Sequence, residues 1–283
     1  MIRVAIPSKG RLRDAVLDVL DRAGYQTSGL AGAAASTETG DVGFIEMRPR
    51  DAAAWLAAGR LDAAFISTDA ALENHIEDFP TLELGFSRST MIVACRDDSP
   101  YENAADLAGK TIATHLPDWT RRWFDSRGIE VTIVAMGGSL EGICAQGLAD
   151  AIVDLRETGR SLTRNSLHAI EEITPCQAVF TMTETDDPAT HGALSAMALR
   201  LTAADTATKR QYLVLHIHPD KVNQLGAVFP GLAAPTILPL AGREDLVAVH
   251  IVVNKADLWP NLSTLQQLGA SGIVALPTEA IVE

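Results

Sequence analysis

Short apolar segments alternate with segments of helical period over the first 210 residues, and this alternation is the strongest constraint on the fold. A helix-period stretch from Leu12 to Ala23 follows the first apolar segment, and similar stretches follow most of the others. Such alternation is typical of parallel sheets covered by helices, so we expect an α/β protein. We also expect TRNSLHAIEE (163–172) to begin a helix. The segments that we assign to strands are IRVAIP, VGFIEM, LDAAFIS, TMIVAC, KTIATH, VTIVAM and ADAIVDL.

The pattern changes after Arg210. From there the segments follow in the order strand, helix, strand, strand, helix, strand, and they are QYLVLHIH, DKVNQLGAVF, APTILPL, VAVHIVV, LWPNLSTLQQLG and GIVALP. This order is typical of a ferredoxin-like βαββαβ module of about 70 residues. We therefore expect a separate C-terminal module with its own sheet.

Composition excludes several classes of protein. A chain of 283 residues that is 47% hydrophobic can bury a sizeable core in two or three domains. Its net charge of −13 argues against a nucleic-acid partner, so an anionic ligand must meet local basic residues. The 3 cysteines are isolated, which favours neither a zinc site nor a disulfide framework. The N-terminus reads as a strand rather than a signal peptide, and no apolar run approaches the ~20 residues of a membrane span, so we expect a cytoplasmic protein without membrane contact.

The stretch DLRETGRSL (154–162) has the features of a phosphate-binding turn. A strand, a turn and a helix that begins near Leu162 would direct free backbone N–H groups towards a ligand, and the helix dipole would favour an anion. Gly159 would allow close backbone approach, while Thr158 and Ser161 would donate hydroxyl hydrogen bonds and Arg160 would supply charge. An ordinary capped helix after a glycine turn fits these nine residues equally well.

Two acidic residues precede this turn. We expect Asp150 and Asp154 to lie at the carboxyl end of the strand. Carboxylates in that place hold ribose hydroxyls or a magnesium ion. The sequence therefore predicts a weak Mg²⁺ site there, in which the ion is shared with the substrate.

Several segments, in order, resemble the long, regulated form of ATP phosphoribosyltransferase, the first enzyme of histidine biosynthesis. The resemblance covers nearly the whole chain. The segments are IPSKGRL (6–12), RPRD (48–51), ADLAGKTIATHLPDWTRRWFDSRGIEV (105–131), GSLEGICAQGLADAIVDLRETGRSL (138–162), FPGLAAPTILPLAGREDLVAVHIVV (229–253) and LGASGIVALP (268–277).

The resemblance implies a bilobal catalytic unit, similar to periplasmic binding proteins, and a C-terminal ferredoxin-like regulatory module. Lobe I would take residues 1–88 and 177–208, and lobe II, with the phosphate loop, residues 89–176. Residues 209–283 would form the regulatory module. In the family, N1 of ATP attacks C1 of phosphoribosyl pyrophosphate (PRPP) and displaces pyrophosphate, with Mg²⁺ present. Such a reaction asks the protein for alignment and for stabilisation of the departing anion.

The resemblance also implies roles for individual residues. Lys9 and Arg11 match positions that face the phosphates or the pyrophosphate, so we expect them to be catalytic. Arg48 and Asp69 match nucleotide-binding positions. The residues that match the PRPP site are Glu141, Asp154, Thr158, Gly159, Arg160, Ser161 and Leu162.

In the C-terminal module the resemblance implies feedback inhibition by histidine and a homo-oligomer, either a dimer or a hexamer. Thr236, Ala270 and Ser271 match effector-loop positions. His216 stands where relatives tend to carry a small polar or acidic residue, and we include it in the effector site. A module that only mediates oligomerisation is the alternative.

The chain departs from the family pattern at the nucleotide side. Family members commonly have glycine at the positions of Ala64 and Ser67, and a basic residue at Thr68. They also place a basic residue in the loop after the first helix, whereas this chain has none between Arg22 and Arg48.

Two alternatives to the family's reaction stay open. One is a diverged phosphoribosyltransferase that uses another nucleotide or base. The departures favour it, and so does Arg156, which stands inside the loop at a position where family members usually have an apolar residue. The other is a non-enzymatic protein that binds a small ligand in the bilobal cleft.

Overall fold

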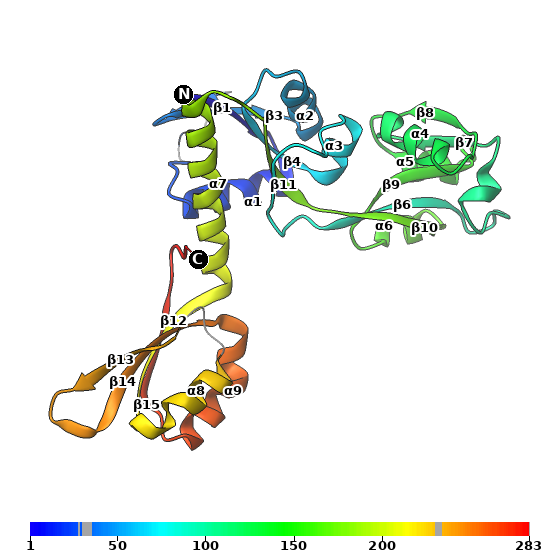
Figure 1. Ribbon diagram of the computed structural model, residues 1–283. Helices are drawn as coiled ribbons and strands as arrows, with labels where there is room; N and C mark the ends of the chain where they lie inside the picture. The colour runs from blue at the N-terminus through cyan, green and yellow to red at the C-terminus, as the bar shows by residue number, and fades with distance from the viewer. Residues whose placement is uncertain (28, 30–35, 230–233, 283) are drawn as a thin grey trace. The chain divides into compact units, whose positions relative to one another are not determined.

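The computed structural model describes residues 1–27, 29, 36–229 and 234–282 (Figure 1). The first sheet begins with the short strand β2 (Ser36–Thr39). The chain divides into two compact units. The first consists of Met1–Leu17 and Thr27–Leu194, and the second of Asp18–Gln26 and Ser195–Glu283.

The first sheet of the first unit has the strand order β2-β3-β1-β4-β11-β5. Its centre is parallel, because β1 pairs in parallel with both β3 and β4. Buried side chains such as Leu56 and Ile66 join the helix α2 to this sheet. The further elements are β1 (Ile2–Pro7), α1 (Gly10–Arg22), β3 (Val42–Met47), α2 (Pro49–Ala57), β4 (Ala63–Ser67), α3 (Thr68–Glu73), β5 (Thr81–Glu83) and β11 (Ala178–Met182).

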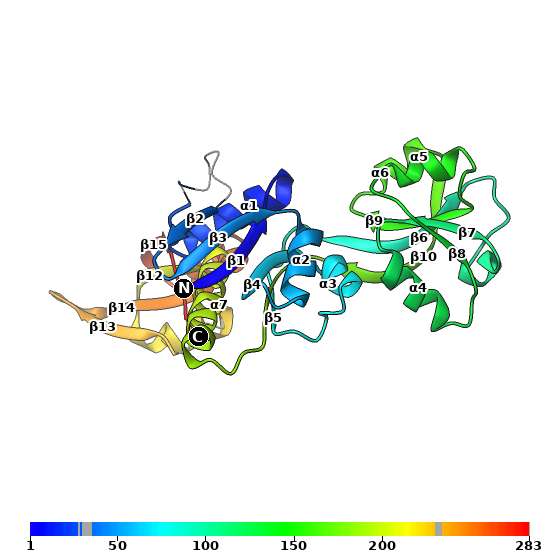
Figure 2. The same ribbon diagram turned by 90° about the horizontal axis from the view of Figure 1, so that it is seen from above.

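The second sheet of this unit has the order β10-β6-β9-β7-β8, and helices cover both of its faces (Figure 2). Trp119, Trp123 and Phe124 of α4 pack on one face, and Leu140 of α5 and Leu162 of α6 pack on the other. Its elements are β6 (Ser89–Arg96), η2 (Ala104–Leu107), β7 (Thr111–Thr114), α4 (Pro117–Asp125), β8 (Thr132–Ala135), α5 (Leu140–Ala145), β9 (Ala151–Arg156), α6 (Arg160–Arg164) and β10 (Leu167–Cys176).

Two expectations about these sheets were wrong. The sheets are mixed rather than parallel, because the chain crosses from the first sheet into β6 and returns through β10 into β11, and these crossing strands run antiparallel to their neighbours. TRNSLHAIEE does not begin a helix. The helix α6 ends at Arg164, Ser166 turns the chain with φ 53°, and β10 then pairs with β6 along its length. This tertiary pairing outweighs the local helical preference.

The cysteines of this unit are free and buried. Burial raises the pKa of the Cys144 thiol to about 11 and that of the Cys176 thiol to about 12. Burial also raises the pKa of Cys95. These thiols therefore stay protonated and pack as small apolar side chains.

The second unit contains an antiparallel sheet with the order β13-β14-β12-β15, and α8 and α9 lie on one side of it (Figure 1). This is the ferredoxin-like βαββαβ arrangement, so that prediction is confirmed. Leu213, Leu215 and Ile217 of β12 face the helices and form the core with them. Within the described residues, no helix has the length and apolar character of a membrane span. The elements are α7 (Pro188–Lys209), which begins in the first unit, β12 (Arg210–Ile217), η3 (Pro219–Lys221), α8 (Val222–Val228), β13 (Thr236–Leu240), β14 (Arg243–Asn254), α9 (Lys255–Gln267) and β15 (Ser271–Pro277).

Candidate active site

A tight turn joins β9 to α6. Gly159 adopts φ 73° and ψ −3°, a left-handed conformation that favours glycine. Leu162 is buried and anchors the short helix in the core of the second sheet. The turn therefore holds its backbone between a buried strand and a buried helix residue.

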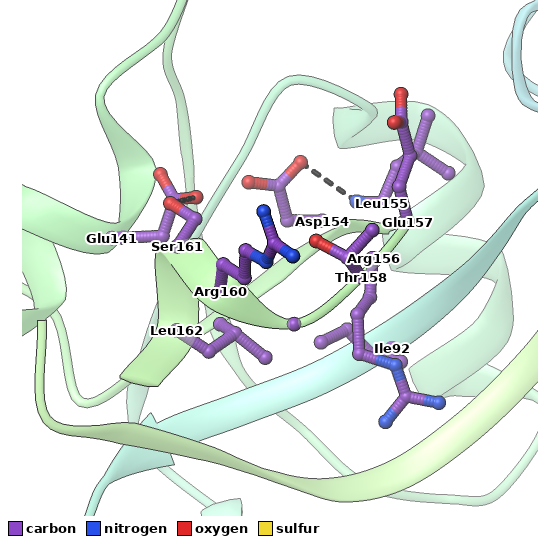
Figure 3. A pocket seen from close by; sticks show the side chains of 11 residues that line it. Ile92, Glu141, Asp154, Leu155, Arg156, Glu157, Thr158, Arg160, Ser161 and Leu162 are labelled. Carbon is purple, nitrogen blue, oxygen red and sulfur yellow. Dashed lines mark hydrogen bonds between the residues drawn. The ribbon is translucent and has the colours of Figure 1, made fainter. Parts of the chain in front are cut away.

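This turn forms most of the wall of a cavity of about 230 Å³, which we call the loop cavity (Figure 3). The structure brings together in it every residue that the sequence assigns to PRPP, although the assignment of the ligand stays a prediction. These residues are Glu141, Asp154, Thr158, Gly159, Arg160, Ser161 and Leu162.

Asp154 is the acidic centre of the loop cavity. Its Oδ1 accepts a hydrogen bond from the Leu155 N–H at 2.7 Å and lies 3.5 Å from His115 Nδ1. Burial raises the pKa of Asp154, and the nearby carboxylates of Glu141 and Asp69 raise it further, whereas the Leu155 N–H and His115 lower it. The carboxylate therefore stands among like charges that a cation or hydroxyl donors would relieve.

Other contacts hold the walls of the loop cavity. The Ser161 hydroxyl donates a hydrogen bond to Glu141 Oε1, which ties the turn to α5. The guanidinium of Arg156 forms an ion pair with Glu172 on β10 and points away from that of Arg160 (Figure 3). Arg156 therefore lines the cavity with its aliphatic stem.

Arg11 does not point into an open cleft. Its Nη2 donates to both carboxylate oxygens of Glu157 in the turn, at 2.8 and 2.6 Å. The pair is exposed, with 84% of the Arg11 side chain and 48% of the Glu157 side chain accessible. Solvent therefore screens this pair, and a more strongly charged ligand can displace it.

A second, larger cavity of about 620 Å³ lies beside the first, and we call it the Lys9 cavity. Lys9, Arg48 and Asp69, three of the residues expected at the substrates, line it together with His115. Asp69 is only 5% exposed, and no hydrogen-bond donor in the described part of the chain reaches its Oδ1. A buried carboxylate oxygen without a donor is costly, which favours a ligand or a cation as its partner.

Glu73, at the end of α3, caps α4. Its carboxylate accepts hydrogen bonds from the N–H groups of Trp119, at 2.9 Å, and Asp118, at 3.2 Å. Arg122 of α4 donates in return to the Leu72 carbonyl. An acidic group at a helix N-terminus is stabilised by the helix dipole, so Glu73 holds the start of the helix that follows His115.

The expected position of Asp150 was wrong. It precedes β9 and lies at the amino end of that strand, not at the carboxyl end with Asp154. Its Oδ1 accepts from the Tyr101 hydroxyl at 3.0 Å and its Oδ2 from the Thr111 N–H at 2.9 Å, so it fastens neighbouring segments. Among the described residues, no three His, Cys, Asp or Glu side chains form a metal-binding group.

The expected effector residues come together only in part. His216 of β12 pairs with Ser271 of β15, and Ala270 directly precedes that strand. The ring of His216 lies against Gly272, where an added Cβ would come within 3.0 Å of Nδ1. Thr236 lies on β13, separated from β12 by β14.

Two positions of the family pattern have a structural explanation. The hydroxyl of Thr68, where the resemblance led us to expect a basic residue, hydrogen-bonds with the backbone of Gln177 at 3.2 Å. Ala64 is fully buried in β4, between Ala5 and Thr181 on the adjacent strands. Ser67, in contrast, lines the Lys9 cavity.

His115, Arg50 and Glu157 line the two cavities, and the sequence reasoning missed all three. Glu157 lies inside the predicted turn but was given no role. The signal for His115 is the parallel register of β7 and β9: Thr114 pairs with Val153, so His115 follows alongside Asp154.

Comparisons with known proteins cover the whole chain. A family model described as ATP phosphoribosyltransferase matches residues 48–203, and one described as the C-terminal domain of HisG matches residues 207–280. The chain is 32% identical to the ATP phosphoribosyltransferase of Maricaulis maris, over 99% of this chain and 98% of that one. It is 31% identical to that of Parabacteroides distasonis over the full length of both.

Among solved structures, an ATP phosphoribosyl transferase (HisG:HisZ) complex from Thermotoga maritima resembles the chain with a TM-score of 0.60 and 27% identity. The match covers 71% of this chain and 99% of that one. The chain therefore belongs to the long form of the ATP phosphoribosyltransferase family, the glycosyltransferases that catalyse the first step of histidine biosynthesis.

Proposed function

We propose that the two adjacent cavities hold the two substrates of the family's reaction, PRPP in the loop cavity and ATP in the Lys9 cavity. The observation that carries this proposal is the contact between His115 and Asp154. His115 lines the Lys9 cavity and Asp154 lines the loop cavity, so their 3.5 Å contact lies where the two cavities meet. Substrates that occupy both cavities would bring their reacting atoms together there.

In the loop cavity, the turn would bind the 5-phosphate of PRPP. Gly159 leaves the backbone open to close approach, Thr158 and Ser161 supply hydroxyls, and Arg160 supplies charge. The free oxygen of Asp154 would accept hydrogen bonds from the ribose hydroxyls. These contacts would hold C1 at the mouth of the Lys9 cavity.

In the Lys9 cavity, the basic side chains of Lys9, Arg48 and Arg50 would face the phosphates. N1 of ATP would attack C1 of PRPP while the bond from C1 to the pyrophosphate oxygen breaks, and pyrophosphate would leave with the electron pair. Lys9 would stabilise the negative charge that develops on the leaving group. Arg11 would add a second cation once the phosphate displaces it from Glu157.

A magnesium ion fits the acidic side chains between the cavities. Asp69 has an unpartnered buried oxygen, and its charge raises the pKa of Asp154, so a divalent cation would relieve an existing repulsion. Because no group of three ligands occurs in the described residues, we propose that Mg²⁺ enters bound to the pyrophosphate of PRPP. When bound, it would neutralise charge on the leaving group.

For the C-terminal module we propose histidine as the effector and a homo-oligomer as the assembly. The cluster of His216, Ala270 and Ser271 supports a small polar ligand at that end of the sheet. On the sheet face opposite the helices, Leu238, Val274 and Leu276 are each nearly half exposed. An apolar sheet face of this kind supports contact with another copy of the chain.

A pyrophosphate-release assay tests this function. We expect turnover with PRPP, Mg²⁺ and ATP, little turnover with ADP, GTP or adenine, and inhibition by added histidine. Turnover with another purine and none with ATP would replace this proposal with the diverged phosphoribosyltransferase. Absence of release with every acceptor, despite PRPP binding, would favour a ligand-binding protein.

We expect Glu157→Gln to tighten PRPP binding about threefold, because it removes a negative charge beside the proposed phosphate and frees Arg11. The free energy of unfolding should change by less than about 0.5 kcal/mol, since the lost ion pair is exposed. Titration calorimetry with PRPP and thermal unfolding check these results. Glu102→Gln, at an exposed glutamate of the same unit, is the control, and weaker PRPP binding in Glu157→Gln would show that Glu157 itself contacts the ligand.

A further inference from the structure

His115 is held beside Asp154 by the strand pairing. The parallel strands β7 and β9 pair Ala113 with Ile152 and Thr114 with Val153, so the next residue of each strand reaches the same edge of the sheet. Both side chains are about four-fifths buried, with 19% of His115 and 20% of Asp154 accessible. Their contact therefore arises from the fold and does not depend on a chance surface rotamer.

The two oxygens of Asp154 have different surroundings. Oδ1 faces His115 Nδ1 and also accepts the Leu155 N–H. The other oxygen points towards the side of the cavity where Glu141 and Ser161 lie (Figure 3). The Leu155 N–H and the His115 ring both lie at Oδ1, which leaves the second oxygen available to a ligand.

The segment that carries His115 is itself tied down by buried hydrogen bonds. The Thr114 hydroxyl oxygen is buried and accepts the Leu116 N–H at 3.0 Å, and the Thr120 hydroxyl lies 3.2 Å from it. Leu116 is fully buried, and the helix that follows is capped by Glu73. His115 thus has firm support on both sides, as a residue needs if it is to orient another.

We propose that His115 is a positioning residue, which orients Asp154 so that the free carboxylate oxygen meets the ribose hydroxyls of PRPP. This inference rests on the proposed placement of PRPP in the loop cavity. The carboxylate favours the ring form that carries a hydrogen on Nδ1, and this hydrogen would face Oδ1 across the 3.5 Å contact. Its role is to fix geometry before the substrate arrives.

Variants at position 115 test the inference. The side-chain amide of His115→Asn places a donor near the position of Nδ1, whereas His115→Gln places it one carbon further out, and His115→Ala removes it. We expect His115→Ala and His115→Gln to raise the Kd and KM for PRPP about tenfold, the size of one hydrogen bond to a charged group, with kcat within about twofold of the wild type. His115→Asn should return both constants to within about threefold of the wild type.

His168→Ala is the matched control. His168 Nδ1 lies 3.3 Å from Asp97 in the same sheet, but neither residue lines either cavity, so its removal should leave PRPP binding unchanged. Calorimetry with PRPP and Mg²⁺, initial-rate kinetics and thermal unfolding give the readouts.

Unchanged PRPP binding in His115→Ala, or equal weakening in His115→Ala and His115→Asn, would overturn the positioning role. A loss confined to kcat would overturn it as well. Asp154→Asn separates this failure from a failure of the proposed function. If Asp154→Asn also binds PRPP normally, the loop cavity is not the PRPP site, whereas if only the His115 variants bind normally, the positioning role alone is wrong.

Discussion

Asp154→Asn is expected to weaken PRPP binding about 100-fold, because it replaces charge-assisted hydrogen bonds to the ribose hydroxyls with neutral ones. The side chain keeps its size and its bond to the Leu155 N–H, so the turn keeps its shape. Titration calorimetry with PRPP and Mg²⁺ measures the effect directly. Binding within about threefold of the wild type would remove Asp154 from the site.

The same variant should not lose stability at neutral pH. Burial raises the pKa of Asp154 above its ordinary value of 3.8, so the folded state binds a proton more readily than the unfolded chain. Such a group contributes stability below the unfolded pKa, and this contribution is lost as pH rises through the folded pKa. Asp154→Asn should therefore melt at the same or a higher temperature than the wild type at pH 7, and this relative advantage should vanish near pH 4.

Asp150→Asn is the matched control for Asp154→Asn. Both oxygens of Asp150 accept hydrogen bonds that join segments of the second sheet, and an amide replaces these charge-assisted bonds with weaker neutral ones and must reverse the bond to the Tyr101 hydroxyl. We expect a loss of about 1–2 kcal/mol in the free energy of unfolding with unchanged PRPP binding. The two aspartates are four positions apart in sequence. The Asp154 variant should lose PRPP binding but not stability, whereas the Asp150 variant should lose stability but not PRPP binding.

Lys9→Met is expected to reduce kcat a few hundredfold, because it removes a cation that would stabilise the departing pyrophosphate. Lys9 is exposed and lines the Lys9 cavity, so the melting temperature should stay unchanged. Lys110→Met, at a lysine that lies over the Tyr101 ring and outside both cavities, is the control. Steady-state kinetics with ATP and PRPP give kcat and both KM values.

Whether the Lys9→Met substitution changes kcat or KM shows which role Lys9 has. A raised KM for ATP with normal kcat would mean that Lys9 binds ATP equally well in the ground state and in the transition state. That outcome would contradict a catalytic role. Arg11, once freed from Glu157, would then remain the candidate for the leaving group.

Patterns that are local in sequence predicted most of the fold. The strand and helix segments, and the βαββαβ order after Arg210, follow from periodicity, which reports the exposure of each element. The direction of each strand does not follow from periodicity. β10 carries an Ala-Ile-Glu-Glu run of ordinary helical preference, and only its partner β6, more than 70 residues earlier, makes it a strand. The domain limits 1–88, 89–176, 177–208 and 209–283 stay predictions.

The site residues also fall into those that local sequence predicted and those that it did not. The turn residues are contiguous, so the sequence alone brought them together, and the structure places them around one cavity. Asp150 was misplaced because periodicity does not say where a strand begins to within four residues. His115 and Asp154 are 39 positions apart, and only the register between two strands makes them neighbours.

The buried cysteines have a practical consequence for studying motion in this enzyme. Because Cys95, Cys144 and Cys176 are inaccessible protonated thiols, they should stay unreactive towards maleimides at pH 7. A cysteine introduced at an exposed position such as Leu148 would then carry a fluorophore alone, without deletion of the native thiols. Paired labels on the two sheets of the first unit could report, in real time, whether the distance between the sheets changes when each substrate binds.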